Sequence, residues 1–305
     1  MNYLVFDWGG TFLKYAVMNE DAEIREKGSL RTPEALDSKE AFYQLLDPIA
    51  EQYRHEISGI AISMPGMLDD RTGYCRTGGM LTFLAGSTVT KDLKARYGLP
   101  VSAENDGKAA VLAEHWKGAL KGCHDCAVIV IGTGIGGGII LNDRLVIGKD
   151  FSAGEYSYLC TNDTKTDMPD GFWCSGGHHA LGTKLAALTG ENAAEIDGIE
   201  LFRRVRNHDE AATQVLREFA AKHAVQIYNL SVLLNLEKIA VGGGISADPL
   251  LVDYLKKALW DMVEKLPFRE GFDVPPMADV VACAFGNDAN LIGALYHHRY
   301  GTWEN

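Results

Sequence analysis

Hydrophobic positions along the chain follow two spacings. Short apolar runs bounded by glycine or polar residues indicate buried strands, and apolar residues three or four positions apart indicate amphipathic helices. Strands are predicted at residues 3–6, 12–18, 23–31, 57–63, 101–103, 127–131, 139–141, 145–147 and 238–241. Helices are predicted at residues 38–54, 88–97, 105–120, 177–188, 198–206, 210–234, 249–265 and 287–300. The polar residues 160–175 are predicted to form a loop.

The order of these elements occurs twice along the chain. Each half begins with a strand, a glycine turn and a second strand, and then continues with a helix, a strand and another helix. No strict repeat of the sequence accompanies this repeated order. Because strands and helices alternate, the pattern predicts an α/β fold.

Both glycine turns have the form expected of a phosphate-binding loop. The first is Asp7-Trp8-Gly9-Gly10-Thr11, and the second is Gly132-Thr133-Gly134-Ile135-Gly136-Gly137-Gly138. Glycine lets a backbone come within hydrogen-bonding distance of a phosphate. Two such loops facing each other would hold the phosphate chain of a nucleotide between two domains, so the sequence points to phosphoryl transfer.

Two other nucleotide-binding folds fit the sequence poorly. Gly132, Gly134 and Gly137 match the Gly-x-Gly-x-x-Gly pattern. A dinucleotide-binding fold needs a helix directly after these glycines, whereas residues 138–141 are predicted to form a strand. The sequence also lacks the Gly-x-x-x-x-Gly-Lys-Ser/Thr pattern of a P-loop.

Charge and composition narrow the class of protein. The 305 residues carry a net charge of −12 and are 47% hydrophobic, as in an ordinary soluble enzyme. Nucleic-acid binding needs a basic surface, and a membrane span needs roughly 18 consecutive apolar residues, which no segment provides. We therefore expect a cytoplasmic protein that binds neither nucleic acid nor membrane.

The six cysteines are expected to be free thiols, as is usual in a cytosolic protein. Cys123 and Cys126 have the Cys-x-x-Cys spacing, but they lie between a predicted helix and a strand, whereas a redox pair usually opens a helix after a strand. A zinc site would need two more ligands, for which Cys174, His178 and His179 are the candidates. Metal binding and redox activity remain open for both groups.

Two polar segments are candidates for substrate chemistry. Glu104-Asn105-Asp106 lies where a strand ends and a helix begins. Asn and Asp are common helix N-caps, but a carboxylate there also suits a general base, because a helix N-terminus favours its ionised form. In the segment Ala153-Gly154-Glu155-Tyr156-Ser157-Tyr158, Glu155 either accepts hydrogen bonds from sugar hydroxyls or belongs to a surface loop.

In combination, these motifs resemble the ROK family of sugar kinases and sugar-responsive repressors, in the actin/hexokinase/Hsp70-like superfamily. The resemblance covers nearly the whole chain. It rests on Asp7-x-Gly-Gly-Thr11-x-x-Lys14, Met64-Pro65-Gly66 with Asp69, Glu104-Asn105-Asp106, residues 131–138, Ala153-Gly154-Glu155, Gly242-Gly243-Gly244, and Gly286-Asn287-Asp288 before Gly293-Ala294.

The resemblance implies two actin-like, or ribonuclease H-like, α/β domains with a nucleotide- and sugar-binding cleft between them. Residues 1–104 with 289–305 would form a small N-terminal domain, and residues 105–288 a larger C-terminal domain. The family also implies a homodimer.

The resemblance further implies ATP and magnesium as cofactors, a sugar as substrate and Asp106 as the general base. The implied sugar-binding residues are Gly66, Gly79, Asn105, Asp106, Glu155 and Tyr158. The implied ATP-binding residues are Asp7, Gly9, Gly10, Thr11, Lys14, Gly132, Thr133, Gly134, Gly136, Gly243 and Gly244, and Asp7 would also lie at the magnesium ion.

Departures from the family pattern bear on the substrate. Ser157-Tyr158 replaces a Gly-His pair whose His touches the sugar in many family kinases, and Cys174 alone remains of a zinc motif, so no structural zinc is expected. With Gly78-Gly79, these features resemble bacterial β-glucoside kinases, which phosphorylate the 6-hydroxyl of the non-reducing glucose of cellobiose-type sugars. Tyr158, Phe172 and Trp173 would then either stack on a second sugar ring or, as is more common for aromatic residues, simply pack within the protein.

Three other functions were weighed against a β-glucoside kinase. A glucokinase or N-acetylmannosamine kinase of the same family is the enzymatic alternative. A repressor would carry a DNA-binding domain before the first phosphate loop, but six residues precede Asp7 and the chain is acidic. A non-catalytic sugar sensor would not need the carboxylate of Asp106 or both phosphate loops.

Overall fold

The structure is a computed structural model that describes residues 1–33, 36–162, 164, 171–266 and 277–301. The chain divides into two compact units. Unit 1 consists of Met1–Trp116, Arg144–Gly154 and Asp288–Asn305, and unit 2 of Lys117–Asp143 and Glu155–Asn287. The domain boundaries expected from the sequence stay a prediction, because compact packing alone does not define independently folding domains.

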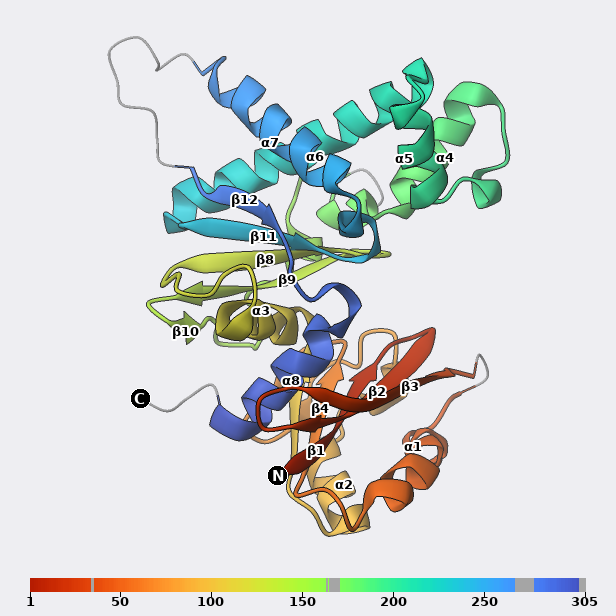
Figure 1. The fold of residues 1–305 in the computed structure, drawn as a ribbon, viewed down its shortest axis with the longest axis vertical. Coiled ribbons are helices and arrows are strands. Elements are labelled where there is room, and N and C mark those ends of the chain that lie inside the picture. The colour runs from red at the N-terminus through yellow and green to blue at the C-terminus, as the bar shows by residue number, and fades with distance from the viewer. Residues whose placement is uncertain (34–35, 163, 165–170, 267–276, 302–305) are drawn as a thin grey trace. The chain divides into compact units, whose positions relative to one another are not determined.

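A mixed sheet forms the centre of unit 1, with strand order β3-β2-β1-β4-β7 (Figure 1). β1, β2 and β3 form an antiparallel meander, while β4 runs parallel to β1 and β7 parallel to β4. The carboxyl ends of β1, β4 and β7 therefore meet at the same edge. The strands are β1 (Asn2–Trp8), β2 (Phe12–Asn19), β3 (Ile24–Arg31), β4 (Ile60–Met64) and β7 (Val101–Asn105).

Helices pack on this sheet and close the core of unit 1. Phe42 of α1 meets Trp8 of β1 edge to face, with 4.8 Å between ring centroids, and both side chains are almost fully buried. α8 contacts β1, β4 and β7. The helices are α1 (Lys39–Tyr53), α2 (Val89–Tyr97), α3 (Asp106–Lys117) and α8 (Ala289–Tyr300), and the short strands are β5 (Leu68–Asp69), β6 (Tyr74–Cys75) and β10 (Arg144–Leu145).

Unit 2 repeats the same topology with a different sequence. The second sheet has the strand order β10-β9-β8-β11-β12, in which β9 is antiparallel to β8 while β11 and β12 run parallel to it. Asp197, Asp209 and Asp248 cap the N-termini of α5, α6 and α7. The elements are β8 (Cys126–Ile131), β9 (Ile135–Leu141), β11 (Lys238–Gly242), β12 (Asp279–Ala282), α4 (His179–Thr189), α5 (Gly198–Arg206), α6 (Glu210–Leu234) and α7 (Pro249–Val263).

The repeated order of elements predicted from the sequence is confirmed, and most predicted strands and helices are present with ends shifted by a few residues. β12 and the β5–β6 hairpin, which are short, were not predicted from the sequence. The predicted strand at 145–147 is confined to β10. The predicted loop at 160–175 contains a bridge between Cys160 and Phe172 and a 3-10 helix at Trp173–Gly176, while residues 163 and 165–170 lie outside the described residues.

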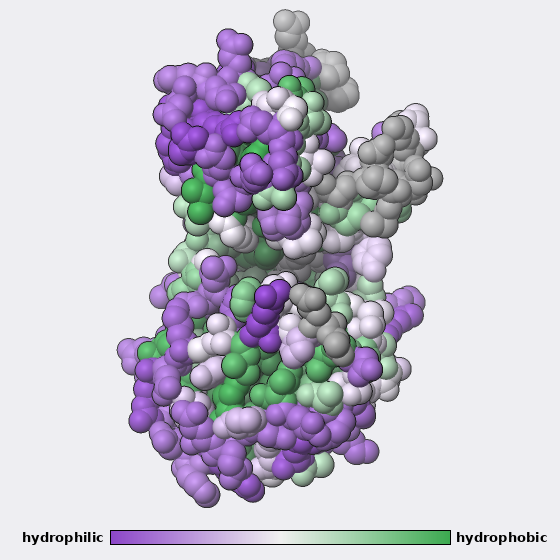
Figure 2. All heavy atoms as spheres, turned by 90° about the vertical axis from the view of Figure 1, so that its right-hand side faces the viewer, coloured by the Kyte–Doolittle hydropathy of each residue, from purple (hydrophilic) through white to green (hydrophobic). Residues whose placement is uncertain are grey.

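The surface carries the polar character expected from the composition. Figure 2 shows that hydrophilic residues dominate the visible outer faces, and that hydrophobic residues gather inside a hydrophilic rim on unit 1, in the lower part of the view. Within the described ranges, no helix combines the length and apolar character needed to cross a bilayer.

A close approach between α8 and α3 gives a stability prediction. A Cβ atom added to Gly293 of α8 would clash with the backbone carbonyl of Ala109 in α3. We expect Gly293→Ala to lower the free energy of unfolding by about 1–3 kcal/mol, the usual cost of overpacking, in urea titrations. The control is Gly136→Ala, whose added Cβ would meet nothing within 4 Å. Equal stability of the two variants would contradict the close contact.

Candidate active site

The carboxylate of Asp7 is held in one position at the end of β1, with only 6% of the residue exposed. Its Oδ1 atom accepts hydrogen bonds from Ser63 Oγ at 3.0 Å and from Asn290 Nδ2 at 3.1 Å, and Lys14 Nζ lies 3.4 Å from Oδ2. The strand registers pair Asp7 with Lys14 on β2 and with Ser63 on β4. Three strands and α8 therefore fix this charge together.

The turn after Asp7 has the tight geometry predicted for a phosphate loop. Gly9 N donates to Phe12 O at 3.0 Å, and a Cβ atom on Gly9 would lie 2.7 Å from that oxygen. Thr32 anchors the turn by donating from Oγ1 to Gly9 O and from N to Thr11 O, both at 2.9 Å. Gly10 and Thr11 are exposed, so their backbone is open to a ligand.

The predicted sugar-binding residues of unit 1 lie together. Asn105 Nδ2 donates to the carbonyl oxygen of Gly66 at 2.9 Å. Gly66 has φ of +97°, and a side chain there would clash with the carbonyl of Thr77. Gly79 packs against the same turn, since a Cβ atom on it would lie 2.8 Å from Pro65 Cβ. Only glycine fits at these two turn positions, and close approach of a substrate to them stays a prediction.

The structure separates the capping and candidate catalytic roles in Glu104-Asn105-Asp106. Asn105 Oδ1 accepts a hydrogen bond from Lys108 N at 3.1 Å, which makes Asn105 the N-cap of α3. Asp106 is the first helical residue, and its Oδ1 accepts from Gly107 N at 2.8 Å. Asp7, Ser63 and Glu104 lie side by side on three neighbouring strands, because Ser63 pairs with both of the others. Asp106 comes two residues after Glu104, just beyond the end of β7.

Glu104, the residue directly before Asn105 in β7, is only 1% exposed. Its Oε1 atom accepts a hydrogen bond from Asn105 N at 2.7 Å. Burial, together with the negative charge of Asp70, raises the pKa of Glu104 to about 8, against the opposing charge of Lys108. No role for Glu104 was predicted from the sequence.

In unit 2, three glycine segments pack backbone to backbone around the loop between β8 and β9. A Cβ atom on Gly177 would clash with the carbonyl of Thr133, and His178 N donates to Gly132 O at 2.9 Å. Gly243 has φ of +98°, and a Cβ atom there would clash with the carbonyl of Ile131. The predicted loops at 132–138 and 242–244 are therefore neighbours, and the segment at 177–178 packs against the first of them.

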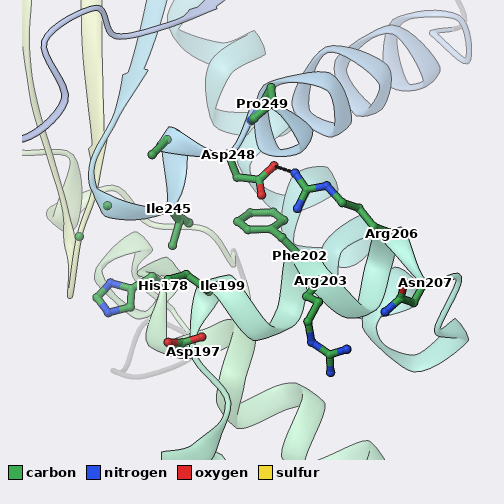
Figure 3. A pocket seen from close by; sticks show the side chains of 14 residues that line it. His178, Asp197, Ile199, Phe202, Arg203, Arg206, Asn207, Ile245, Asp248 and Pro249 are labelled. Atoms are coloured by element: carbon green, nitrogen blue, oxygen red, sulfur yellow. Dashed lines mark hydrogen bonds and ion pairs between the residues drawn. The ribbon is translucent and has the colours of Figure 1, made fainter.

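A cavity of about 810 Å³ opens beside these loops, within the size range of small-molecule sites. Figure 3 shows the ring of Phe202 next to an ion pair between Arg206 and Asp248, whose atoms are 2.7 Å apart. Ile199 and Ile245 lie on one side of that ring. The residues lining the cavity include Gly132, His178, Phe202, Arg206, Gly244 and Asp248.

The sequence predicted Gly132 and Gly244 at this site but missed the side chains of α5. Phe202 and Arg206 lie on a helix whose apolar spacing signals only packing, so no local motif marks them. The cap residue Asp248 carried a weak signal, because it precedes a proline at a helix start.

Glu155 and Tyr158 belong to unit 2, whereas Gly66, Gly79, Asn105 and Asp106 belong to unit 1. Tyr156–Tyr158 form a 3-10 helix beside the glycine loop, where Ser157 Oγ donates to Ile135 O and Tyr156 OH to Gly138 O. Tyr158 is 65% exposed and thus accessible to a ligand. A shared sugar site of both sets stays a prediction.

Comparison with known proteins decides the family. The model of the ROK family matches residues 3–299. The chain belongs to the ROK family. The chain is similar to a β-glucoside kinase of Listeria monocytogenes, with 32% identity over 299 residues, 97% of each chain. It is also similar to an N-acetylmannosamine kinase of Haemophilus influenzae, with 26% identity over 306 residues, covering 97% of this chain and 95% of that one.

A solved structure supports the actin-like fold of the ROK family for this chain. It is a ROK family protein from Streptococcus pneumoniae in complex with sucrose, 28% identical, with a TM-score of 0.85 and coverage of 98% of both chains. The two sheets of this chain, each a hairpin followed by parallel strands, agree with that assignment.

The segment that differs from the ROK zinc motif is held by aromatic packing. Trp173 is 2% exposed and its ring lies 5.8 Å from that of Tyr156 and 5.5 Å from that of His223, measured between centroids. Its burial favours the packing role of Trp173 over stacking on a sugar ring. The rings of His178 and His179 lie 4.0 Å apart, and the expected lack of a zinc ion there stays a prediction.

The Cys-x-x-Cys pair has the properties of buried, unreactive thiols. All six cysteines are described, and none is in a disulfide. Burial raises the pKa of Cys123 and raises that of Cys126 to about 12. Because the thiolate is the reactive form, this environment argues against a redox role.

His223 gives a prediction for acid stability. Burial lowers the pKa of His223 to about 4, below its ordinary value, so the unfolded chain binds the proton first and stability falls as the pH drops from about 6.5 towards 4. When the pH is lowered from about 7.5 to about 4.5, we expect His223 to reduce the free energy of unfolding by roughly 2–3 kcal/mol.

The measurement is urea unfolding of the wild type and of His223→Gln at both pH values. The wild type should lose more stability on acidification than the variant, since glutamine does not titrate. An identical loss in both proteins would show that His223 is protonated without cost.

Proposed function

We propose that the chain transfers the γ-phosphoryl group of ATP to the 6-hydroxyl of a β-glucoside such as cellobiose. The observation that carries the proposal is the corner where β4 and β7 end, which brings Gly66, Asn105 and Asp106 together next to the buried carboxylate of Asp7. Family membership over nearly the whole chain makes the protein a sugar kinase. Higher identity to the β-glucoside kinase than to the N-acetylmannosamine kinase favours a β-glucoside.

Asp106 is the general base in this proposal. Its carboxylate takes the proton of the sugar hydroxyl while that oxygen forms a bond to the γ-phosphorus, and ADP leaves with the electrons of the broken bond. Asn105 orients the sugar, and its own orientation is set by its bonds to Gly66 O and Lys108 N. Asp106 is the first residue of α3, and its neighbour Asn105 caps that helix. The base therefore keeps a fixed position.

The cavity of unit 2 suits the nucleoside of ATP. Phe202 and Ile199 offer apolar surface for a base, and Arg206 is fixed by Asp248. In this proposal, the backbones of the glycine loop at 132–136 and of Gly243–Gly244 bind the phosphates of ATP. In unit 1, Lys14 and the turn at Gly9–Thr11 form a second candidate phosphate-binding segment.

Asp7 fits a magnesium ion bound with ATP. Magnesium takes oxygen ligands and is usually held by one or two carboxylates, water and substrate phosphates, and Asp7 presents a fixed carboxylate beside the phosphate turn. Bound there, the ion would neutralise charge on the β- and γ-phosphates. A cytoplasmic location and a homodimer complete the proposal as predictions.

Removing the base should separate catalysis from binding. We expect Asp106→Asn to lower kcat by at least about 100-fold, because general-base catalysis is worth roughly 10²–10⁴-fold, while sugar binding stays within about tenfold. Steady-state ADP release and calorimetric titration with the sugar measure the two effects. A variant that keeps more than about a tenth of wild-type kcat would exclude Asp106 as the base.

A substrate panel tests the sugar. ADP release with ATP and magnesium is compared for cellobiose, gentiobiose, glucose, N-acetylmannosamine and fructose, with reactions lacking magnesium as controls. We expect the β-linked disaccharides to give the highest kcat/KM. Preference for glucose or N-acetylmannosamine would favour the alternative kinases and keep the mechanism, and no turnover with any sugar would favour a sensor.

A further inference from the structure

Three ionisable side chains from separate elements converge in the interior of unit 1. Asp70 follows β5, Glu104 lies in β7 and His297 lies in α8. Their residues are 5%, 1% and 6% exposed, and one donor atom of each lies within 4.8 Å of the other two. Among the described residues, this is the one group of histidine, cysteine and acidic side chains close enough to share a metal ion.

Two of the converging atoms lack hydrogen-bond partners within the part of the chain that the structure describes. They are Glu104 Oε2 and His297 Nδ1, which lie 3.7 Å apart. That distance is too long for a hydrogen bond, but two ligands each about 2.1 Å from a tetrahedral ion lie about 3.4 Å apart. Leaving buried polar atoms unpaired costs free energy, so both atoms point to a missing ligand.

The charges of the group also call for a cation. Asp70 and Glu104 place two carboxylates close together in a buried site. The charge of Lys108, itself only 2% exposed, offsets part of this negative charge, and its Nζ also donates to Phe151 O at 3.0 Å. A proton on Glu104 would reduce the repulsion but would leave Oε2 3.7 Å from His297 Nδ1. A cation between them would satisfy both atoms and offset both carboxylates.

We propose that Asp70, Glu104 and His297 bind one divalent transition-metal ion of the zinc class. An imidazole nitrogen with two carboxylate oxygens suits zinc, manganese or cobalt, whereas magnesium and calcium prefer oxygen ligands alone. Three protein ligands leave one position of a tetrahedral ion for water. The proposal is independent of the proposed phosphoryl transfer and of the magnesium ion at Asp7.

The site would join the loop after β5, the end of β7 and α8. Glu104 directly precedes Asn105, and its other carboxylate oxygen already accepts from Asn105 N. A bound ion would therefore fix Glu104 from one side while Glu104 fixes the backbone of the sugar-binding corner from the other.

The experiment measures metal binding by the full chain. Protein purified and treated with a chelator is dialysed against Zn²⁺ or Co²⁺ alone, and bound metal is measured by mass spectrometry and by Co²⁺ absorption. We expect one ion per chain, and at least about 100-fold weaker binding for Glu104→Gln and for His297→Gln, since even outer-shell changes cost 10–100-fold. The double variant His178→Asn with His179→Asn is the matched control and should bind as the wild type does.

Three outcomes would overturn the proposal. The first is a wild-type chain that takes up no Zn²⁺ or Co²⁺, which needs no variant and so does not depend on whether the variants fold. The second is unchanged affinity in folded Glu104→Gln and His297→Gln, and the third is loss of binding in the histidine control. Thermal melting gives an independent check, because an ion that binds only the folded chain raises the Tm of the wild type.

Discussion

The buried carboxylate of Asp7 is the constraint on which unit 1 depends. A charge with 6% exposure is costly unless hydrogen bonds and opposite charge compensate it. Those groups come from Lys14 on β2, Ser63 on β4 and Asn290 on α8. The carboxylate is therefore stable only when the hairpin, the parallel strand and the last helix are all in place, so the correct fold and the correct position of the charge require each other.

Unit 2 reaches a similar geometry by a different physical route. Among its described residues, the loops carry no buried charge of this kind. They are positioned by direct contact between backbones at Ile131 with Gly243 and at Thr133 with Gly177. Such contacts tolerate no Cβ atom, which is why the glycines cluster there. The same strand order thus positions one loop by electrostatics and the other by steric fit, and the two halves can share a topology without sharing a sequence.

Sequence patterns were sufficient where a signal is local. The apolar runs at β1, β8 and β11 and the glycines that follow them located the loops, because a turn that needs positive φ or close packing selects glycine within a few residues. Asn105 and Asp106 were found for the same reason, since a helix start favours these residue types.

What the sequence could not predict depends on contacts between distant segments. Ser63 is a small polar residue in an apolar strand, and only the β1–β4 register shows that it serves Asp7. Phe202 has the spacing of an ordinary packed residue, and the cavity beside it exists only after α5 is placed. His297 and Asp70 are 227 positions apart (297 − 70 = 227), and no periodicity relates them.

The start of α3 shows how a structural role and a candidate chemical role can be divided between neighbours. If Asp106 were the N-cap, its carboxylate would accept from a backbone N–H two or three residues further along the helix, whereas in the structure its Oδ1 accepts from the N–H of the next residue, Gly107. Asn105 takes the cap instead, and its amide holds the carbonyl of Gly66 as well. A neutral side chain thus satisfies the helix terminus, and the charged one lies in the first turn, where the helix dipole favours a carboxylate. The order Asn-Asp, rather than Asp-Asn, is what this division requires.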